Sequence, residues 1–112
     1  MNRKKILNHL IHFDLPLNEV QNQLNEYEWN SEILIVLEKK DLILILKKYL
    51  NDLISKEELE LWANMIESRD DIGCGKSDFN LIKEIVFIIA NPSISMKLTK
   101  TNVIKILEKL ES

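Results

Sequence analysis

The chain has 112 residues and a formal net charge of −3; 46% of its residues are hydrophobic, 29% are charged, and only two are glycine and two proline. This composition excludes a disordered, collagen-like or low-complexity protein, and the length is typical of one domain with one moderate core. Few helix-breaking residues and abundant Leu, Ile, Lys, Glu and Asn predict an all-α fold. We therefore expect residues 1–112 to form a compact single-domain bundle of five or six short helices.

The N-terminal part of the chain predicts two helices. Apolar side chains recur at helical spacing in residues 3–13, and the basic residues at its start oppose the helix macrodipole, so we expect the first turn to fray. His9 and His12 are one turn apart, a spacing that can hold a metal, but no further ligands follow and we interpret them as surface residues. Pro16 marks the start of a second helix, whose inward stripe is Leu17, Val20, Leu24 and Tyr27.

The next stretch is ambiguous. The helical pattern breaks at residues 29–31, where Trp29 is a candidate interface residue. Residues 33–37 form a short apolar run, ILIVL, and periodicity alone does not distinguish a buried strand from a helical turn there, so both remain open. Asp41 is then expected to cap a helix that runs to about Leu53, with Leu53 facing inward.

Residues 55–75 carry the strongest local signals. Ser55 followed by Glu58 is a capping-box pattern, which predicts a helix start. Apolar residues, including Trp62, share one face of this helix, and we assign them to the core. The opposite face is polar and mainly acidic, and it consists of Glu57, Glu60, Asn64 and Glu67. Arg69-Asp70-Asp71 and two glycines should end regular structure after this helix.

Two further helices are expected towards the C-terminus. Ser77 or Asp78 should begin a helix that Asn91-Pro92 ends, and its second half is apolar nearly all round, so we expect other helices to surround it. Thr99 or Thr101 should cap the last helix. No segment reads as a signal peptide or membrane span and the chain has a single cysteine, so a cytoplasmic location is expected.

Possible catalytic patterns in the sequence are incomplete. Residues 73–77 imitate the end of a phosphate-binding loop, but Asp70 replaces its first glycine and a helix is expected where a strand should precede it. Cys74 should be an exposed, mobile thiol without an adjacent base, and acidic neighbours would raise its pKa. Asp71 and its neighbours lack the spacing of a calcium loop. We therefore predict no enzymatic activity, no cofactor and no metal.

Acidic residues are concentrated in residues 52–78, which contain eight acidic and three basic side chains. Negative charge repels phosphate and steers association with basic proteins, so we expect a protein partner and not nucleic acid. A solvated helix face that keeps the domain soluble is the alternative explanation.

Three segments resemble a known class of protein. They are the block W-A-N-x-I-E-x-R-D-D-I at residues 62–72, LKKYLNDLISKEELE at residues 46–60 and KEIVFIIANP at residues 83–92. They resemble small bacterial immunity proteins of contact-dependent growth inhibition and related polymorphic toxin systems. The resemblance covers about the C-terminal two-thirds of the chain. It implies a cytoplasmic protein that binds and blocks the C-terminal domain of a toxin, typically a nuclease with a basic cleft.

These observations lead to a hypothesis about the binding residues. An acidic surface could occupy a basic nuclease cleft where phosphates would otherwise lie. The residues assigned to this surface are Glu57, Glu60, Asn64, Glu67, Asp70 and Asp71. A second interpretation stays open, in which Arg69, Asp70 and Asp71 form local ion pairs that only stabilise the fold.

A DNA-binding regulator is the alternative function. Residues 93–110 can be interpreted as the turn and recognition helix of a small helical DNA-binding protein. Its basic residues Lys97, Lys100, Lys105 and Lys109 are offset by Glu108 and Glu111, and no arginine is present there to contact guanine.

Overall fold

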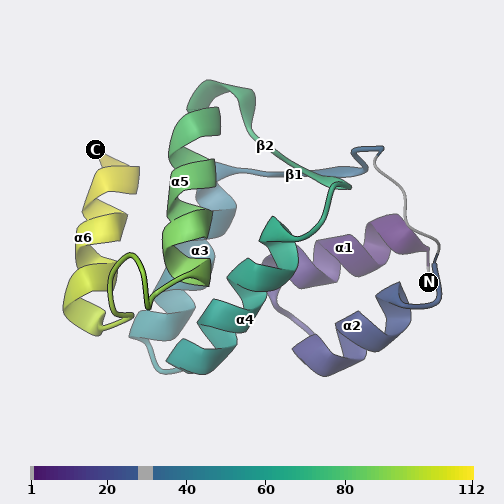
Figure 1. Ribbon diagram of the computed structural model, residues 1–112, viewed down its shortest axis with the longest axis horizontal. Coiled ribbons are helices and arrows are strands. Elements are labelled where there is room, and N and C mark those ends of the chain that lie inside the picture. Colours follow the sequence, from purple (N-terminus) through teal and green to yellow (C-terminus); the bar gives the residue numbers. More distant parts are fainter. Residues whose placement is uncertain (1, 28–31) are drawn as a thin grey trace.

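The computed structural model describes residues 2–27 and 32–112, and helices dominate it (Figure 1). Trp29 lies outside the described residues. The elements follow in the order α1 (Arg3–His12), α2 (Leu17–Leu24), β1 (Ile35–Leu37), α3 (Lys39–Leu50), α4 (Lys56–Glu67), β2 (Ile72–Cys74), the 3-10 helix η1 (Lys76–Asp78), α5 (Phe79–Ala90) and α6 (Lys100–Glu111). The prediction of a compact, helical bundle is confirmed, with a small sheet in addition. None of the described helices is long and apolar enough to cross a membrane.

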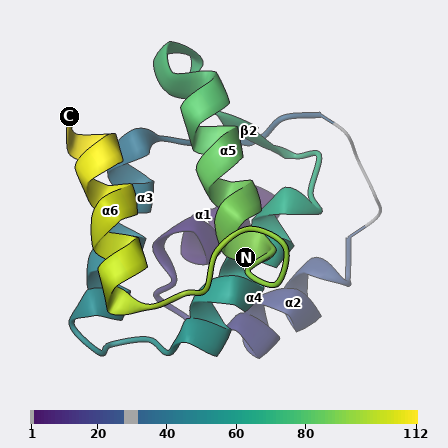
Figure 2. The same ribbon diagram turned by 60° about the vertical axis from the view of Figure 1, so that its left-hand side comes forward.

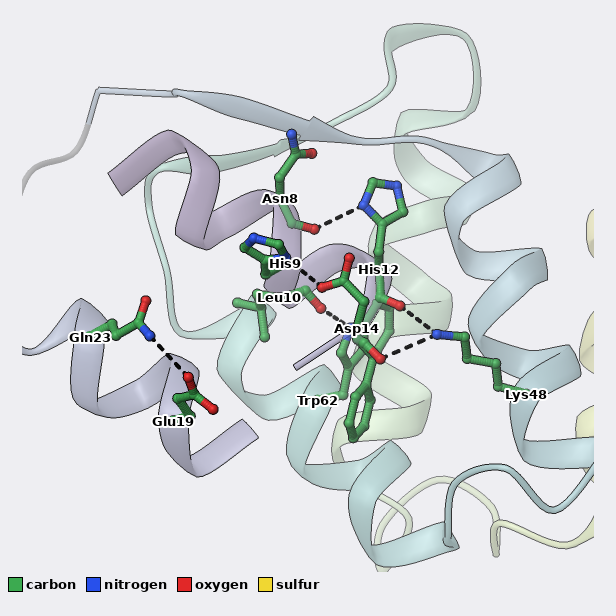
Figure 3. A network of polar contacts seen from close by, with 10 residues as sticks. Asn8, His9, Leu10, His12, Asp14, Glu19, Gln23, Lys48 and Trp62 are labelled. Atoms are coloured by element: carbon green, nitrogen blue, oxygen red, sulfur yellow. Dashed lines mark hydrogen bonds and ion pairs between the residues drawn. The ribbon is translucent and has the colours of Figure 1, made fainter. Parts of the chain in front are cut away.

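One hydrophobic core connects the helices, and Trp62 is its largest fully buried side chain. The Trp62 side chain is fully buried, as expected, and its Nε1 donates a hydrogen bond of 2.7 Å to the carbonyl of Leu10 (Figure 3). Lys48 Nζ from α3 donates to the carbonyls of His12 and Phe13, at 2.7 and 3.2 Å. Side chains of α3 and α4 thus donate to carbonyls at the end of α1, where the last carbonyls of a helix have no amide partner four residues further on.

The N-terminal helices differ in detail from the prediction. The first turn of α1 is helical and capped, because Asn2 Oδ1 accepts a 2.9 Å hydrogen bond from the Lys5 amide. Arg3 also lies 3.6 Å from the carboxylate of Asp71. Helix α2 ends at Leu24, so Tyr27 is exposed and not part of the inward stripe.

Helix α3 begins two residues before the predicted cap. Glu38 is its N-cap, and Asp41 accepts a hydrogen bond from the Glu38 amide at 2.9 Å, so Asp41 closes the first turn from inside the helix. The helix ends at Leu50 because Asp52 adopts a positive φ of 60°. Leu53 therefore does not face inward, and 70% of it is exposed.

The ambiguous apolar run contributes a strand. Strands β1 and β2 pair in parallel, with Ile35 opposite Ile72, Val36 opposite Gly73 and Leu37 opposite Cys74. Helices α3 and α4 lie between the two strands in the chain. The prediction that the glycines end regular structure is wrong for Gly73, because β1 supplies it with a ladder partner from a distant part of the sequence.

Helix α5 is less enclosed than predicted. It ends at Ala90, as the Asn91-Pro92 pair indicates, and it packs along α4 (Figures 1 and 2). One side of it nevertheless faces solvent, where Phe79 and Phe87 are 45% and 47% exposed. Helix α6 begins after Thr99, whose hydroxyl accepts a hydrogen bond from the Asn102 amide, and it packs mainly on α3.

Candidate functional site

Helix α4 presents most of the predicted binding residues on one exposed face. Its start is fixed by the predicted capping box, in which the Ser55 hydroxyl accepts from the Glu58 amide at 3.0 Å and Glu58 Oε1 accepts from the Ser55 amide at 2.9 Å. We define the α4 acidic face as four exposed residues and the half-buried Glu60. These residues are Glu57, Glu60, Asn64, Glu67 and Asp70.

Asp71, the sixth predicted residue, is not on this surface. Only 1% of Asp71 is exposed, and its two carboxylate oxygens each accept a 2.8 Å hydrogen bond from the Arg69 guanidinium. Its backbone carbonyl accepts hydrogen bonds from the amides of Leu34 and Ile35. Together with Arg3, these contacts join α1, the segment before β1 and the turn after α4. The assignment of Asp71 to the binding surface is therefore wrong, and its ion pair is structural.

The sequence block at residues 62–72 thus divides into two sets. The inward set packs in the core or forms the buried ion pair: Trp62, Ala63, Met65, Ile66, Arg69, Asp71 and Ile72. The exposed set contains Asn64, Glu67, Ser68 and Asp70. Most of the block is accordingly a signature of the fold, and its outward positions are the ones that can contact a partner.

Two grooves separate the acidic side chains into two groups. Glu57 and Glu60 border a depression of about 400 Å³ between the start of α4 and the segment before α6, together with Lys56 and Lys97. The two lysines offset the negative charge at this end of the face. At the other end of α4, the acidic residues border a separate groove.

We call this second depression the sheet groove; it has a volume of about 300 Å³ and lies between the end of α4, β2 and α5. Its apolar lining comes from Ile33, Ile66, Ile72, Phe79 and Val86, and its polar lining from Glu67, Arg69, Asp70 and Lys83, with Gly73 and Cys74 of β2. Helix α5 and β2 are connected through η1 at the top of Figure 1. The groove therefore combines apolar side chains with an acidic rim contributed by α4.

Cys74 lines this groove but is not an activated nucleophile. The thiol is half-buried in β2, so the predicted exposed and mobile cysteine is wrong. Burial raises the pKa of Cys74, and the positive charge of Lys83 partly opposes this rise. The predicted direction of the pKa shift is correct, but its cause is desolvation and not the acidic neighbours.

The element that precedes the phosphate-loop pattern, whose first glycine would be at residue 70, is helix α4, as predicted, and Gly73 and Cys74 lie within strand β2. The loop also offers no cradle for an anion. A Cβ atom on Gly75 would lie 2.5 Å from Glu38 Oε2, so a carboxylate occupies the space beside this glycine. The Gly75 amide also donates to the carbonyl of Leu37, at 2.9 Å. A phosphate there would meet negative charge and an engaged amide.

The two histidines lie at the end of α1 and contact protein groups (Figure 3). His9 Nδ1 is 2.6 Å from Asp14 Oδ1, and His12 Nδ1 is 2.9 Å from the carbonyl of Asn8. Within residues 2–27 and 32–112, no three His, Cys, Asp or Glu side chains gather as they would around a metal ion.

The α5 side of the sheet groove was not predicted. Phe79, Lys83 and Phe87 recur at a spacing of four on the exposed side of α5, and Lys83 Nζ lies 5.2 Å from the centre of the Phe79 ring. The spacing of four could be recognised in the sequence, because residues four apart lie on the same face of a helix. The contribution of Ile33 had no such signal, because it depends on the pairing of β1 with β2.

The basic residues near α6 are partly neutralised. Lys100 Nζ lies 2.9 Å from Asp52, and Lys109 Nζ lies 3.1 Å from Glu84. Two of the four lysines that could contact DNA phosphates are therefore paired with carboxylates of the same chain.

No protein-family model matches this chain, and neither does any curated protein or solved structure.

Proposed function

We propose that this chain is a cytoplasmic bacterial immunity protein that binds the C-terminal domain of a cognate toxin and blocks it without any enzymatic activity of its own. The observation that carries the proposal is the α4 acidic face, which stands on a capped helix anchored in the core by Trp62. A fixed surface loses little conformational entropy on binding, which favours tight inhibition.

The mechanism we infer is steric and electrostatic occlusion. A nuclease domain needs a basic cleft to bind its substrate, and carboxylates presented by Glu57, Glu67 and Asp70 can take the place of phosphates in that cleft. The half-buried Glu60 adds charge beside Glu57. The same negative charge disfavours nucleic acid as a partner of this face.

The first experiment is co-expression of the chain with the C-terminal portion of the protein encoded immediately upstream of it. We expect a one-to-one complex and rescue of growth from the toxicity of that portion. Absence of both toxicity and a complex contradicts the proposal. Retention of the chain on DNA at moderate salt would then favour the small DNA-binding regulator, since Lys97 and Lys105 of that segment are exposed.

A charge reversal tests the surface itself. The double substitution Glu60→Lys and Glu67→Lys changes one acidic residue in each groove, and we expect slower association, weaker protection and a smaller dependence of affinity on salt. The matched control is Glu108→Lys with Glu111→Lys on α6, which changes the net charge equally at exposed positions. Unchanged affinity and salt dependence in the α4 variant would mean that this face only solvates the domain.

A further inference from the structure

The sheet groove has the features of a specificity pocket, and its floor results from the register of the strands. Val36 pairs with Gly73, and directly paired residues of neighbouring strands project from the same face of a sheet. Val36 is exposed, so this face is the outer one, and β2 places no side chain on it at Gly73. Ile33 fills part of the space, since a Cβ atom on Gly73 would lie 3.2 Å from Ile33 Cγ2.

Large apolar side chains line this hollow yet remain in contact with solvent. Ile33 is 59% exposed and Phe79 is 45% exposed, and both face the groove whose inner lining is Ile66, Ile72 and Val86. The Phe79 ring is additionally held by the Lys83 ammonium group above it. Exposed apolar side chains that are clustered and rimmed by charges mark interaction sites on soluble proteins.

The two rims of the groove carry opposite charges. Glu67, Arg69 and Asp70 stand on the α4 side, and the Arg69 guanidinium donates two hydrogen bonds to the buried carboxylate of Asp71, which compensates its charge. Lys83 stands on the α5 side. A ligand that places a cation beside α4 therefore meets the carboxylates of Glu67 and Asp70. In the reversed orientation the same cation would lie beside Lys83 and be repelled.

We propose that the sheet groove takes one apolar side chain of the protein partner, and that a Lys or Arg adjacent to it in the partner's chain pairs with Glu67 and Asp70. This inference rests on the proposed function in that the partner is a basic protein. The groove itself, with a volume of about 300 Å³, has room for one apolar side chain, and it adjoins an outer depression of about 710 Å³ that shares Ile33, Gly73, Cys74 and Phe79 with it. We assign the site to a basic partner protein because its cations complement Glu67 and Asp70, and self-association of this chain is the outcome that the concentration dependence of the shifts tests below.

Two matched substitutions on α5 test the inference in the complex. Phe79→Ala removes one wall of the groove, whereas Phe87→Ala removes an equally exposed ring on the same helix but outside the groove lining. We expect Phe79→Ala to weaken binding of the toxin domain at least tenfold and Phe87→Ala less than twofold, as measured by calorimetry. Equal losses, or no loss for Phe79→Ala, would overturn the inference while leaving the proposed function intact.

A peptide titration tests the groove without the toxin domain. Acetyl-Leu-Arg-Leu-amide and acetyl-Leu-Glu-Leu-amide are added to the isotope-labelled protein, and amide and methyl chemical shifts are followed. We expect shifts confined to residues such as Ile33, Ile72 and Phe79, with the basic peptide binding at least tenfold more tightly, and both effects absent in Phe79→Ala. Shifts elsewhere, equal binding of the two peptides, or concentration-dependent shifts from self-association would overturn the inference.

Discussion

Asp70 and Asp71 are adjacent aspartates that occupy opposite environments. Asp70 is exposed on the rim of the sheet groove, whereas Asp71 is buried and receives two hydrogen bonds from Arg69. Buried carboxylates require such partners, because an ionised group without them would be strongly destabilised in the interior. We therefore assign Asp71 a role in folding and Asp70 a role in recognition.

Replacing each aspartate by asparagine should have very different effects on stability. Asp71→Asn removes the negative charge that compensates Arg69 and Arg3, and we expect the free energy of unfolding to fall by about 2–4 kcal/mol. Asp70→Asn should leave it unchanged, because the side chain is exposed. Urea unfolding followed by circular dichroism measures both variants. A similar, small effect at the two positions would contradict the structural role of Asp71.

The role of Trp62 was predictable from the sequence, whereas that of Asp71 was predictable only in part. Trp62 was assigned to the core because its spacing from Leu59 and Ile66 places it on the apolar face, and this is confirmed. The ion pair of Arg69 with Asp71 was one of the two interpretations that the sequence left open, whereas the contact of Asp71 with Arg3 could not be predicted, because Arg3 is distant in sequence. Local sequence patterns contain no information about such a distant ion pair.

At the scale of secondary-structure elements, helix ends with local capping signals were predictable. Ser55 with Glu58 and Thr99 mark helix starts through side chains close in sequence; the first was predicted, and Thr99 was one of the two candidates for the last helix. The two strands have three residues each and depend on pairing between distant segments, so hydrophobic periodicity could not identify them. The outer hollow of the sheet groove depends on that pairing and was equally inaccessible to prediction.

Helices α1 and α3 end in the same type of turn, and neither has a glycine at its left-handed position. After α3, the Leu53 amide donates to the carbonyl of Lys48 and the Asp52 amide donates to that of Tyr49, the hydrogen-bond pattern of a Schellman motif. Asp52 has a φ of 60°, and Phe13 occupies the equivalent position after α1 with a φ of 48°. This region of backbone conformation normally favours glycine.

The turn after α3 provides a comparison of two substitutions. Asp52→Gly and Asp52→Ala both remove the exposed ion pair with Lys100, but only glycine adopts a φ of 60° without steric cost. We therefore expect the glycine variant to be about 1 kcal/mol more stable than the alanine variant. Thermal unfolding at equal protein concentration measures the difference. Equal stability would mean that the turn tolerates Ala as well as Gly.

Across the whole molecule, α4 occupies the centre and α2 the periphery (Figure 1). Helix α4 buries Leu59, Trp62 and Ala63 completely and packs along α5. Helix α2 has only eight residues and follows Pro16, whose ring provides no acceptor for the free amides of its first turn. Local opening is easiest where few apolar side chains are buried and helix ends are not capped.

Hydrogen exchange should therefore separate the two helices. We expect amides of α2 to exchange at least about tenfold faster than those of α4 under native conditions, once intrinsic rates are corrected, because α2 can open without exposing Trp62. Helix α6 is the internal control, since it is also peripheral but begins at the Thr99 cap, and it should exchange more slowly than α2. Equal protection in α2 and α4 would instead indicate one cooperative unit. The predicted order places the α4 acidic face on a more stable helix than α2, so that the backbone that carries these side chains is already formed before a partner binds.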